Sequence, residues 1–128
     1  MEAIRNVPGA PKPVGPYSPA VCATGLVFLA GQIGLDPESG VMVGGGVQAE
    51  AKQVLKNLEA VLAASGSSKE KIVMTTVFLA DIADGKIVNE LYGAWVNQDA
   101  PPARQTVAVK DLPMGAKVEI SVIAVAAR

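Results

Sequence analysis

Arg104, Thr106 and Glu119 are the residues of this chain whose types and spacing best suit chemistry. A guanidinium group presents a planar fork of donors that pairs with both oxygens of a carboxylate. A nearby glutamate can orient or deprotonate a water molecule and later return the proton. These residues therefore predict a site that binds a small carboxylate and directs water at it. The alternatives are a structural Arg104–Glu119 ion pair and a solvated sheet face.

A β-hairpin over residues 101–125 is the element expected to position these side chains. Two alternating runs flank Leu112-Pro113-Met114-Gly115, a sequence that suits a type I turn. Alternate side chains of a strand share one face, and burial of the apolar set fixes the register. The sets expected to lie inward are Gln105, Val107 and Val109 in the first strand, and Val118, Ile120, Val122 and Ala124 in the second. We therefore expect Arg104, Thr106 and Glu119 to lie together on the opposite face.

The composition excludes several classes of catalytic and metal-binding site. The chain has 128 residues, which suits one domain spanning residues 1–128, and it carries a net charge of −1. Histidine is absent, which removes Ser–His and Cys–His nucleophile pairs and histidine-bound zinc. The single cysteine, Cys22, excludes a cysteine-cluster metal site, so no metal is expected. The start lacks the apolar core of a secretory signal, and no run is long enough to span a bilayer, so we expect a cytoplasmic protein without membrane contact.

The remaining pattern predicts an α+β sandwich with two helices on one face of a mixed sheet. Strands are expected at 20–24, 26–33 and 72–80, and helices at 47–65 and from an Asp84 cap to about Val96. Residues 1–19 carry five prolines and are expected to be irregular. The strands near 26–30 and 72–80 are apolar on both faces, but two helices can cover only one face. We therefore expect a homo-oligomer in which another copy covers the second face.

Several motifs resemble those of the RidA/YjgF family, and the resemblance spans residues 15–125. The motifs are Gly15-Pro16-Tyr17-Ser18, Ala30-Gly31-Gln32-Ile33-Gly34, Thr75-Thr76-Val77-Phe78-Leu79, Asn89 with Tyr92, Pro102-Ala103-Arg104 and Val118-Glu119-Ile120. The resemblance implies a chorismate-mutase-like subunit with a six-stranded sheet, and a homotrimer with sites between subunits. It also implies 2-iminobutanoate/2-iminopropanoate deaminase activity without a cofactor. Such an enzyme hydrolyses enamine and imine intermediates released by pyridoxal-phosphate enzymes, giving 2-oxo acids and ammonia.

By motif position, the resemblance assigns carboxylate binding to Arg104 and water orientation to Glu119. Tyr17, Gly31 and Asn89 would line the pocket, and Thr106 joins them through its place beside Arg104. The chain departs from the commonest family pattern in two places. Ala30 stands where many members have serine, and Thr106 stands where many have cysteine. These departures bear on substrate preference and rate more than on the class of activity.

Two other functions compete with the deaminase. Some family members are described as endoribonucleases or translation inhibitors, but the net charge, the absence of histidine and an aromatic content of 4% are poorly suited to RNA. A non-catalytic sensor or chaperone that binds 2-oxo or imino acids would need Arg104, whereas Glu119 would be dispensable for binding. A turnover assay separates these alternatives.

Overall fold

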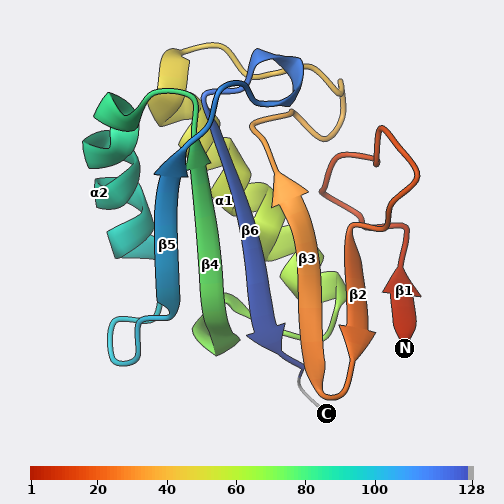
Figure 1. The fold of residues 1–128 in the computed structure, drawn as a ribbon. Helices are drawn as coiled ribbons and strands as arrows, with labels where there is room; N and C mark the ends of the chain where they lie inside the picture. The colour runs from red at the N-terminus through yellow and green to blue at the C-terminus, as the bar shows by residue number, and fades with distance from the viewer. Residues whose placement is uncertain (127–128) are drawn as a thin grey trace.

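The computed structural model describes residues 1–126 and shows a six-stranded sheet, with α1 behind the sheet and α2 next to β5 at the left in the view of Figure 1. The sheet order is β1-β2-β3-β6-β4-β5, in which only β4 and β5 pair in parallel. The predicted α+β class with two helices on one face of a mixed sheet is confirmed. The strands are β1 (Glu2–Ile4), β2 (Ala20–Ala23), β3 (Leu26–Gln32), β4 (Ile72–Leu79), β5 (Ala103–Ala108) and β6 (Val118–Val125). The helices are α1 (Gly46–Ala64) and α2 (Gly85–Trp95), with short 3-10 turns η1 (Lys69–Lys71), η2 (Ile82–Asp84) and η3 (Pro113–Gly115).

The core lies between α1 and the sheet, and the helix predicted at 47–65 is confirmed, with an apolar stripe that faces the sheet. The buried stripe residues are Val47, Ala51, Val54, Leu55, Leu58, Val61 and Leu62. Each large apolar side chain buried in this way contributes roughly 1.5–3 kcal/mol. Gly66 follows the end of the helix, and its φ of 73° lets the Ser67 amide donate to the Leu62 carbonyl at 2.9 Å. None of the helices among residues 1–126 could cross a membrane.

The predicted hairpin over 101–125 is wrong, because β4 lies between β5 and β6. The strand β6 has one fully buried face and therefore takes a central position between β3 and β4. The strand β5 carries polar residues on both faces and lies at the sheet edge, where all its residues are exposed. The expected type I turn is instead η3, in which Met114 adopts φ 58°.

The predicted shared face is also wrong, because Arg104 and Thr106 lie on the opposite side of the sheet from Glu119. Arg104 pairs with buried Thr75, which faces the helices, and Thr106 pairs with buried Val77. Glu119 instead pairs with Phe78, on the face that the helices leave open. An edge strand has no burial to fix its inward face, so the assignment of the Val107 set to the core had no physical support.

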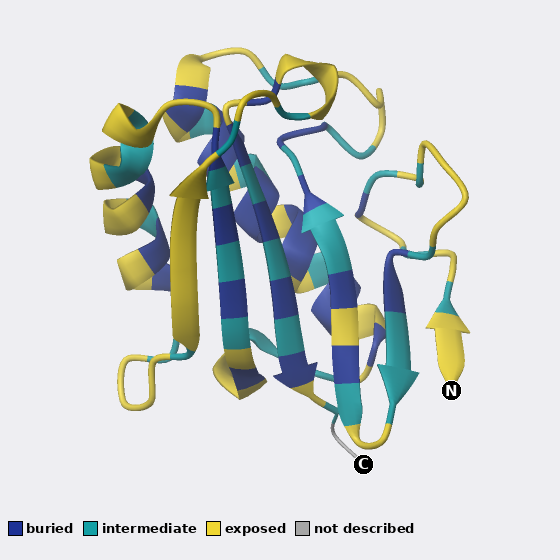
Figure 2. Ribbon diagram, in the orientation of Figure 1, coloured by how far each residue is buried: buried dark blue, intermediate teal, exposed yellow. Residues whose placement is uncertain are grey.

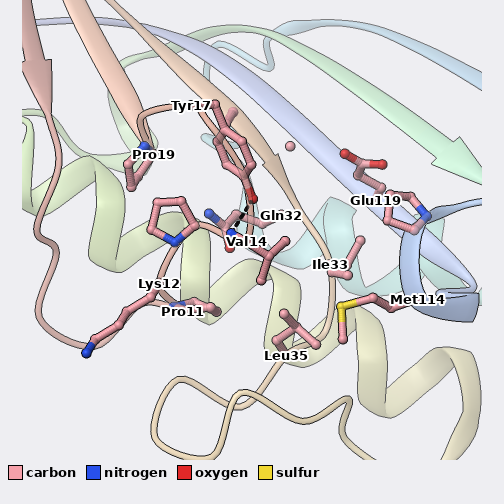
Figure 3. A pocket seen from close by; sticks show the side chains of 14 residues that line it. Pro11, Lys12, Val14, Tyr17, Pro19, Gln32, Ile33, Leu35, Met114 and Glu119 are labelled. Atoms are coloured by element: carbon pink, nitrogen blue, oxygen red, sulfur yellow. Dashed lines mark hydrogen bonds between the residues drawn. The ribbon is translucent and has the colours of Figure 1, made fainter.

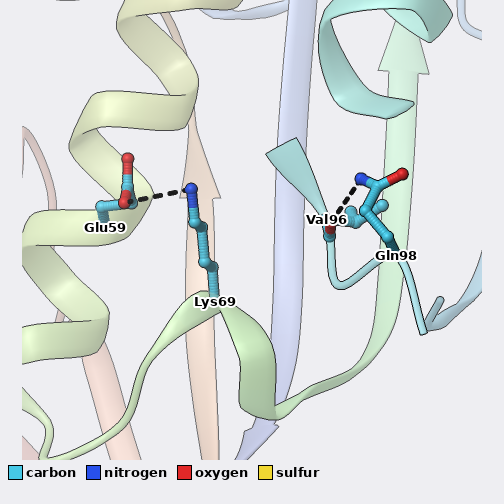
Figure 4. Close-up of polar contacts among 4 residues, drawn as sticks. All are labelled: Glu59, Lys69, Val96 and Gln98. Atoms are coloured by element: carbon cyan, nitrogen blue, oxygen red, sulfur yellow. Dashed lines mark hydrogen bonds and ion pairs between the residues drawn. The ribbon is translucent and has the colours of Figure 1, made fainter. Parts of the chain in front are cut away.

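Two smaller differences from the predictions concern the N-terminal segment and the residue that caps the second helix. The first 19 residues are not wholly irregular, because β1 pairs with β2. Asp84 makes no side-chain capping bond, and Asp81 instead accepts a hydrogen bond from the Ala83 amide at the start of η2. Figure 4 shows one contact between η1 and α1 and one within the loop that follows α2. Lys69 pairs with Glu59 of α1 at 3.9 Å, and Gln98 donates to the Val96 carbonyl at 2.8 Å, in the loop that leads to β5.

The open face of the sheet is markedly apolar. Figure 2 shows buried residues alternating with less buried ones along β4 and β6, whereas β5 is exposed throughout. Phe28 is 41% exposed and Val107 is 44% exposed on this face, beside half-buried Phe78 and Ile123. The prediction that the two helices cover only one side of β3 and β4 is confirmed. The single chain therefore leaves a surface of the kind that a protein partner covers.

Candidate functional site

Tyr17, Gly31 and Glu119 lie around one pocket on the open face of the sheet (Figure 3). Its cavity measures about 330 Å³. Figure 3 shows the Tyr17 ring and the Glu119 carboxylate on two sides of it, with Leu35 and Met114 at its far end. The other lining residues are mainly apolar: Pro11, Pro13, Val14, Pro19, Ala30 and Ile33, with Lys12, Gln32 and Pro113. The arrangement places one carboxylate in a largely apolar hollow.

Gly31 is where the Glu119 side chain lies directly against the backbone of β3. The pairing of β3 with β6 is interrupted between Leu29 and Gln32, so Gly31 lies in an irregular stretch opposite the start of β6. A Cβ atom at position 31 would overlap the Glu119 carboxylate. Only glycine therefore lets the Glu119 side chain lie over the end of β3.

Glu119 has the electrostatics of a group suited to proton transfer. Burial raises the pKa of its carboxyl above the ordinary value of 4.5. Within residues 1–126, its carboxylate makes no hydrogen bond and no ion pair. Its oxygens are therefore available to a water molecule or a substrate.

Tyr17 is held over the pocket by the proline-rich loop that precedes β2. The Tyr17 amide donates to the Gly15 carbonyl at 2.9 Å, and the Val14 amide donates to the Tyr17 hydroxyl at 3.4 Å. The Ala30 amide donates to the Pro19 carbonyl at 2.9 Å, which ties this loop to β3. Tyr17 as a whole remains 50% exposed, so it is accessible to a ligand or to a neighbouring chain.

Arg104 and Asn89 form a second cluster, on the helix side of the sheet. The Arg104 guanidinium donates to the Asn89 side-chain oxygen and lies 5.0 Å from the centre of the Tyr92 ring. The Tyr92 and Thr75 hydroxyls are hydrogen-bonded at 2.7 Å, which anchors the ring on β4. Both the amide and the ring thus hold a guanidinium that remains exposed at the edge of the sheet.

The structure therefore separates the predicted site residues into two groups. Tyr17, Gly31 and Glu119 share the open-face pocket, whereas Arg104 and Asn89 lie together beyond the other face. Thr106 follows Arg104 on the same side of β5. The predicted Arg104–Glu119 ion pair, offered as the structural alternative, does not form within the chain.

The sequence analysis gave no role in the site to two residues that contribute to these groups. Tyr92 was named only as part of a motif with Asn89, yet its ring supports Arg104. Met114 was placed in a turn, yet it reaches the Glu119 pocket because η3 packs beside the start of β6. A signal for Tyr92 existed in its spacing of three from Asn89 on a helix. No pattern in the sequence indicates the position of Met114.

Comparison with known proteins assigns the family. Residues 8–126 match the family described as "Endoribonuclease L-PSP". The chain is 49% identical over 116 residues to the mouse protein named 2-iminobutanoate/2-iminopropanoate deaminase, covering 91% of this chain and 85% of that one. The chain belongs to the RidA/YjgF family. It is also 53% identical over 118 residues to the Myxococcus xanthus protein DfrA, covering 91% of this chain and 89% of that protein.

Solved structures of the RidA/YjgF family have the same fold. The Escherichia coli YjgF gene product matches with a TM-score of 0.89 and 37% identity, covering 98% of both chains. The expected chorismate-mutase-like fold is confirmed by this likeness. Relatives named as imine deaminases also place this RidA/YjgF member in a family that includes enzymes.

Proposed function

We propose that the protein hydrolyses small 2-imino acids, such as 2-iminobutanoate and 2-iminopropanoate, to 2-oxo acids and ammonia. The observation that carries this proposal is the half-buried Glu119 carboxylate, free of partners among residues 1–126, against Gly31 in an apolar pocket. The names of the mammalian relatives, at 46% and 49% identity, support the same activity. An imine carbon is already electrophilic, so a bound carboxylate, a placed water and proton transfer are sufficient, and we propose no metal or cofactor.

The proposed reaction needs the group that contains Arg104 and the group that contains Glu119 to act on the same substrate molecule. Arg104 binds the substrate carboxylate through two parallel hydrogen bonds. Glu119 accepts a proton from water as the water oxygen bonds to the carbon of the protonated imine, which gives a neutral carbinolamine. Glu119 then returns this proton to the nitrogen. It accepts the proton of the carbinolamine hydroxyl as the C–N bond breaks, so that ammonia leaves and a 2-oxo acid remains. The apolar wall of Ile33, Leu35 and Met114 packs against the substrate side chain.

A second copy of the chain is proposed to bring the two groups together. Within one chain the sheet separates Arg104 from Glu119. The exposed β5 edge and the uncovered apolar face are both available to a neighbour. A contact between these two different surfaces of neighbouring copies is heterologous, and it can close into a ring. We propose that the ring is a homotrimer with one site at each boundary between copies.

The ribonuclease function suggested by the family description receives no support from a specific observation. The chain has a net charge of −1 and no histidine. The Glu119 pocket is lined mainly by apolar side chains rather than by a basic surface suited to phosphates. We therefore propose the deaminase alone.

A coupled assay tests this function directly. A threonine dehydratase or an amino-acid oxidase generates the imine, and its decay is followed with and without the purified protein. We expect the protein to accelerate decay, with 2-oxo acid and ammonia formed in equal amounts. Unchanged decay at a saturating protein concentration would remove the deaminase proposal, and binding without acceleration would favour a sensor.

Replacing Gly31 with alanine tests the close approach at the pocket. The added Cβ must displace the Glu119 carboxylate, so we expect kcat/KM to fall by roughly a hundredfold. Gly44→Ala is the matched control, because a Cβ there meets nothing within 4 Å. The Gly44→Ala protein should have the same activity as the wild type. A Gly31→Ala protein with normal kcat/KM would show that Glu119 need not lie where the structure places it.

The raised pKa of Glu119 predicts opposite pH effects on activity and stability. Because the carboxylate must be ionised to accept a proton, kcat/KM should fall on acidification with a midpoint above 4.5. The folded state binds this proton more tightly than the unfolded state, so ionisation costs stability as pH rises from 4.5 through the raised pKa. Glu119→Gln should therefore have a higher Tm than the wild type above this window, and the difference should vanish below it. A Tm difference that is independent of pH would contradict the assignment.

A further inference from the structure

The helix α1 carries polar side chains on the face that packs against the site loops. Glu50 is 5% exposed and Asn57 is completely buried, and Gln53 lies between them. Burying such groups is costly unless their hydrogen bonds are satisfied. Apolar residues would stabilise a helix–sheet core more simply. The partners of these side chains therefore indicate what they are for.

Asn57 holds the segment that follows β3. Its amide nitrogen donates to the Ile33 carbonyl at 3.2 Å and to the Leu35 carbonyl at 3.0 Å. Gln53 donates to the Asn57 side-chain oxygen at 2.9 Å, which fixes the orientation of the amide group. Both Ile33 and Leu35 line the Glu119 pocket. One buried amide thus sets the apolar wall of the pocket.

Glu50 holds the segment that leads into β6. Its Oε1 atom accepts a hydrogen bond from the Lys117 amide at 2.8 Å, two residues before Glu119. The same turn of helix also meets the loop after β3, because a Cβ at Gly34 would lie 2.9 Å from the Glu50 Cα. Glu50 therefore contacts the segment that follows β3 and the segment that precedes β6, the two strands that carry Gly31 and Glu119.

We propose that Glu50 and Asn57 are positioning residues that fix the pocket from behind. Glu50 sets the place of Glu119, and Asn57 sets the wall of Ile33 and Leu35. The kinetic part of this proposal rests on the proposed deaminase function. A purely structural role would instead lower stability without a selective effect on either kinetic constant.

Steady-state kinetics distinguish the proposed role of Glu50 from that of Asn57. Glu50→Leu should lower kcat about tenfold with little change in KM, because Glu119 acts on water. Glu50→Gln keeps an oxygen acceptor for the Lys117 amide and should restore most of kcat. Asn57→Leu should mainly raise KM, about tenfold, because it loosens the wall that packs on the substrate side chain. If Asn57→Leu does not fold, Gln53→Ala should raise KM in the same direction by a smaller factor.

Ser65→Ala is the matched control. Ser65 is a buried polar residue just after α1 whose hydroxyl donates to the Val61 carbonyl at 2.7 Å, away from the pocket residues. It should lose stability with unchanged kcat and KM. Equal kinetic losses in Ser65→Ala and Glu50→Leu, or a failure of Glu50→Gln to recover kcat, would overturn the positioning role.

Amide hydrogen exchange gives a readout that does not depend on the proposed function. Exchange at residues 117–119 should accelerate in Glu50→Leu but not in Glu50→Gln, and exchange at 33–35 should accelerate in Asn57→Leu. Ser65→Ala should change neither segment. Unchanged exchange in both segments would overturn the inference even if the wild type is a deaminase. Accelerated exchange with an inactive wild type would instead remove only the proposed reaction.

Discussion

Replacing Arg104 with alanine is expected to reduce kcat/KM for 2-iminobutanoate hydrolysis about a thousandfold. The loss corresponds to about 4 kcal/mol of transition-state stabilisation, which is typical when one partner of a desolvated, hydrogen-bonded charge pair is removed. Because the Arg104 side chain is exposed on the single chain, its removal should leave the fold of that chain intact. Steady-state kinetics and thermal unfolding of the same preparation check both expectations.

Two further variants sharpen the Arg104 prediction. Arg104→Lys keeps the charge but loses the planar fork, so it should recover only part of the lost activity. Lys86→Ala makes the same change in net charge on the exposed surface of α2 and should leave kcat/KM unchanged. Full activity in Arg104→Ala would show that another group binds the substrate carboxylate.

Replacing Glu119 with alanine is expected to lower kcat by roughly a hundredfold to a thousandfold, the usual worth of a positioned general base. KM should change little, because in the proposed mechanism Arg104 and the apolar wall bind the substrate. Glu38→Ala, which removes an exposed carboxylate from a surface turn, is the control and should behave as the wild type. A Glu119→Ala protein that loses binding and keeps kcat would assign the glutamate to substrate binding instead.

The fold was predictable where one physical signal dominated. The stripe of Val54, Leu58 and Val61 has the period of a helix, and the structure buries all of it. The alternation of Val118, Ile120 and Val122 likewise identifies the buried face of β6. What alternation does not specify is which strand lies beside which. The chain order suggested a β5–β6 hairpin, whereas β4 separates these strands.

The site was predictable as a set of residues but not as an arrangement. Arg104 and Glu119 stand out because of their chemistry and their motif positions, and each does lie beside other predicted site residues. Their assignment to one face failed because β5 is an exposed edge whose orientation depends on pairing with Thr75 and Val77, not on burial. The supporting role of Asn57 depends on carbonyl groups 22 and 24 residues away, which no sequence pattern indicates.

A mixture of two inactive variants tests the central claim, that the site is completed by a neighbouring copy. Arg104→Ala and Glu119→Ala chains, with different tags, are produced together and the mixed oligomers are purified through both tags. In a randomly assembled equal mixture, about a quarter of the boundaries join an intact Glu119 pocket to an intact Arg104, whatever the ring size. Before purification through the tags, we expect the mixture to have about a quarter of the wild-type activity. The purified mixed oligomers should be more active than either variant alone. Mixed oligomers with no more activity than the separate variants would contradict a site shared between copies.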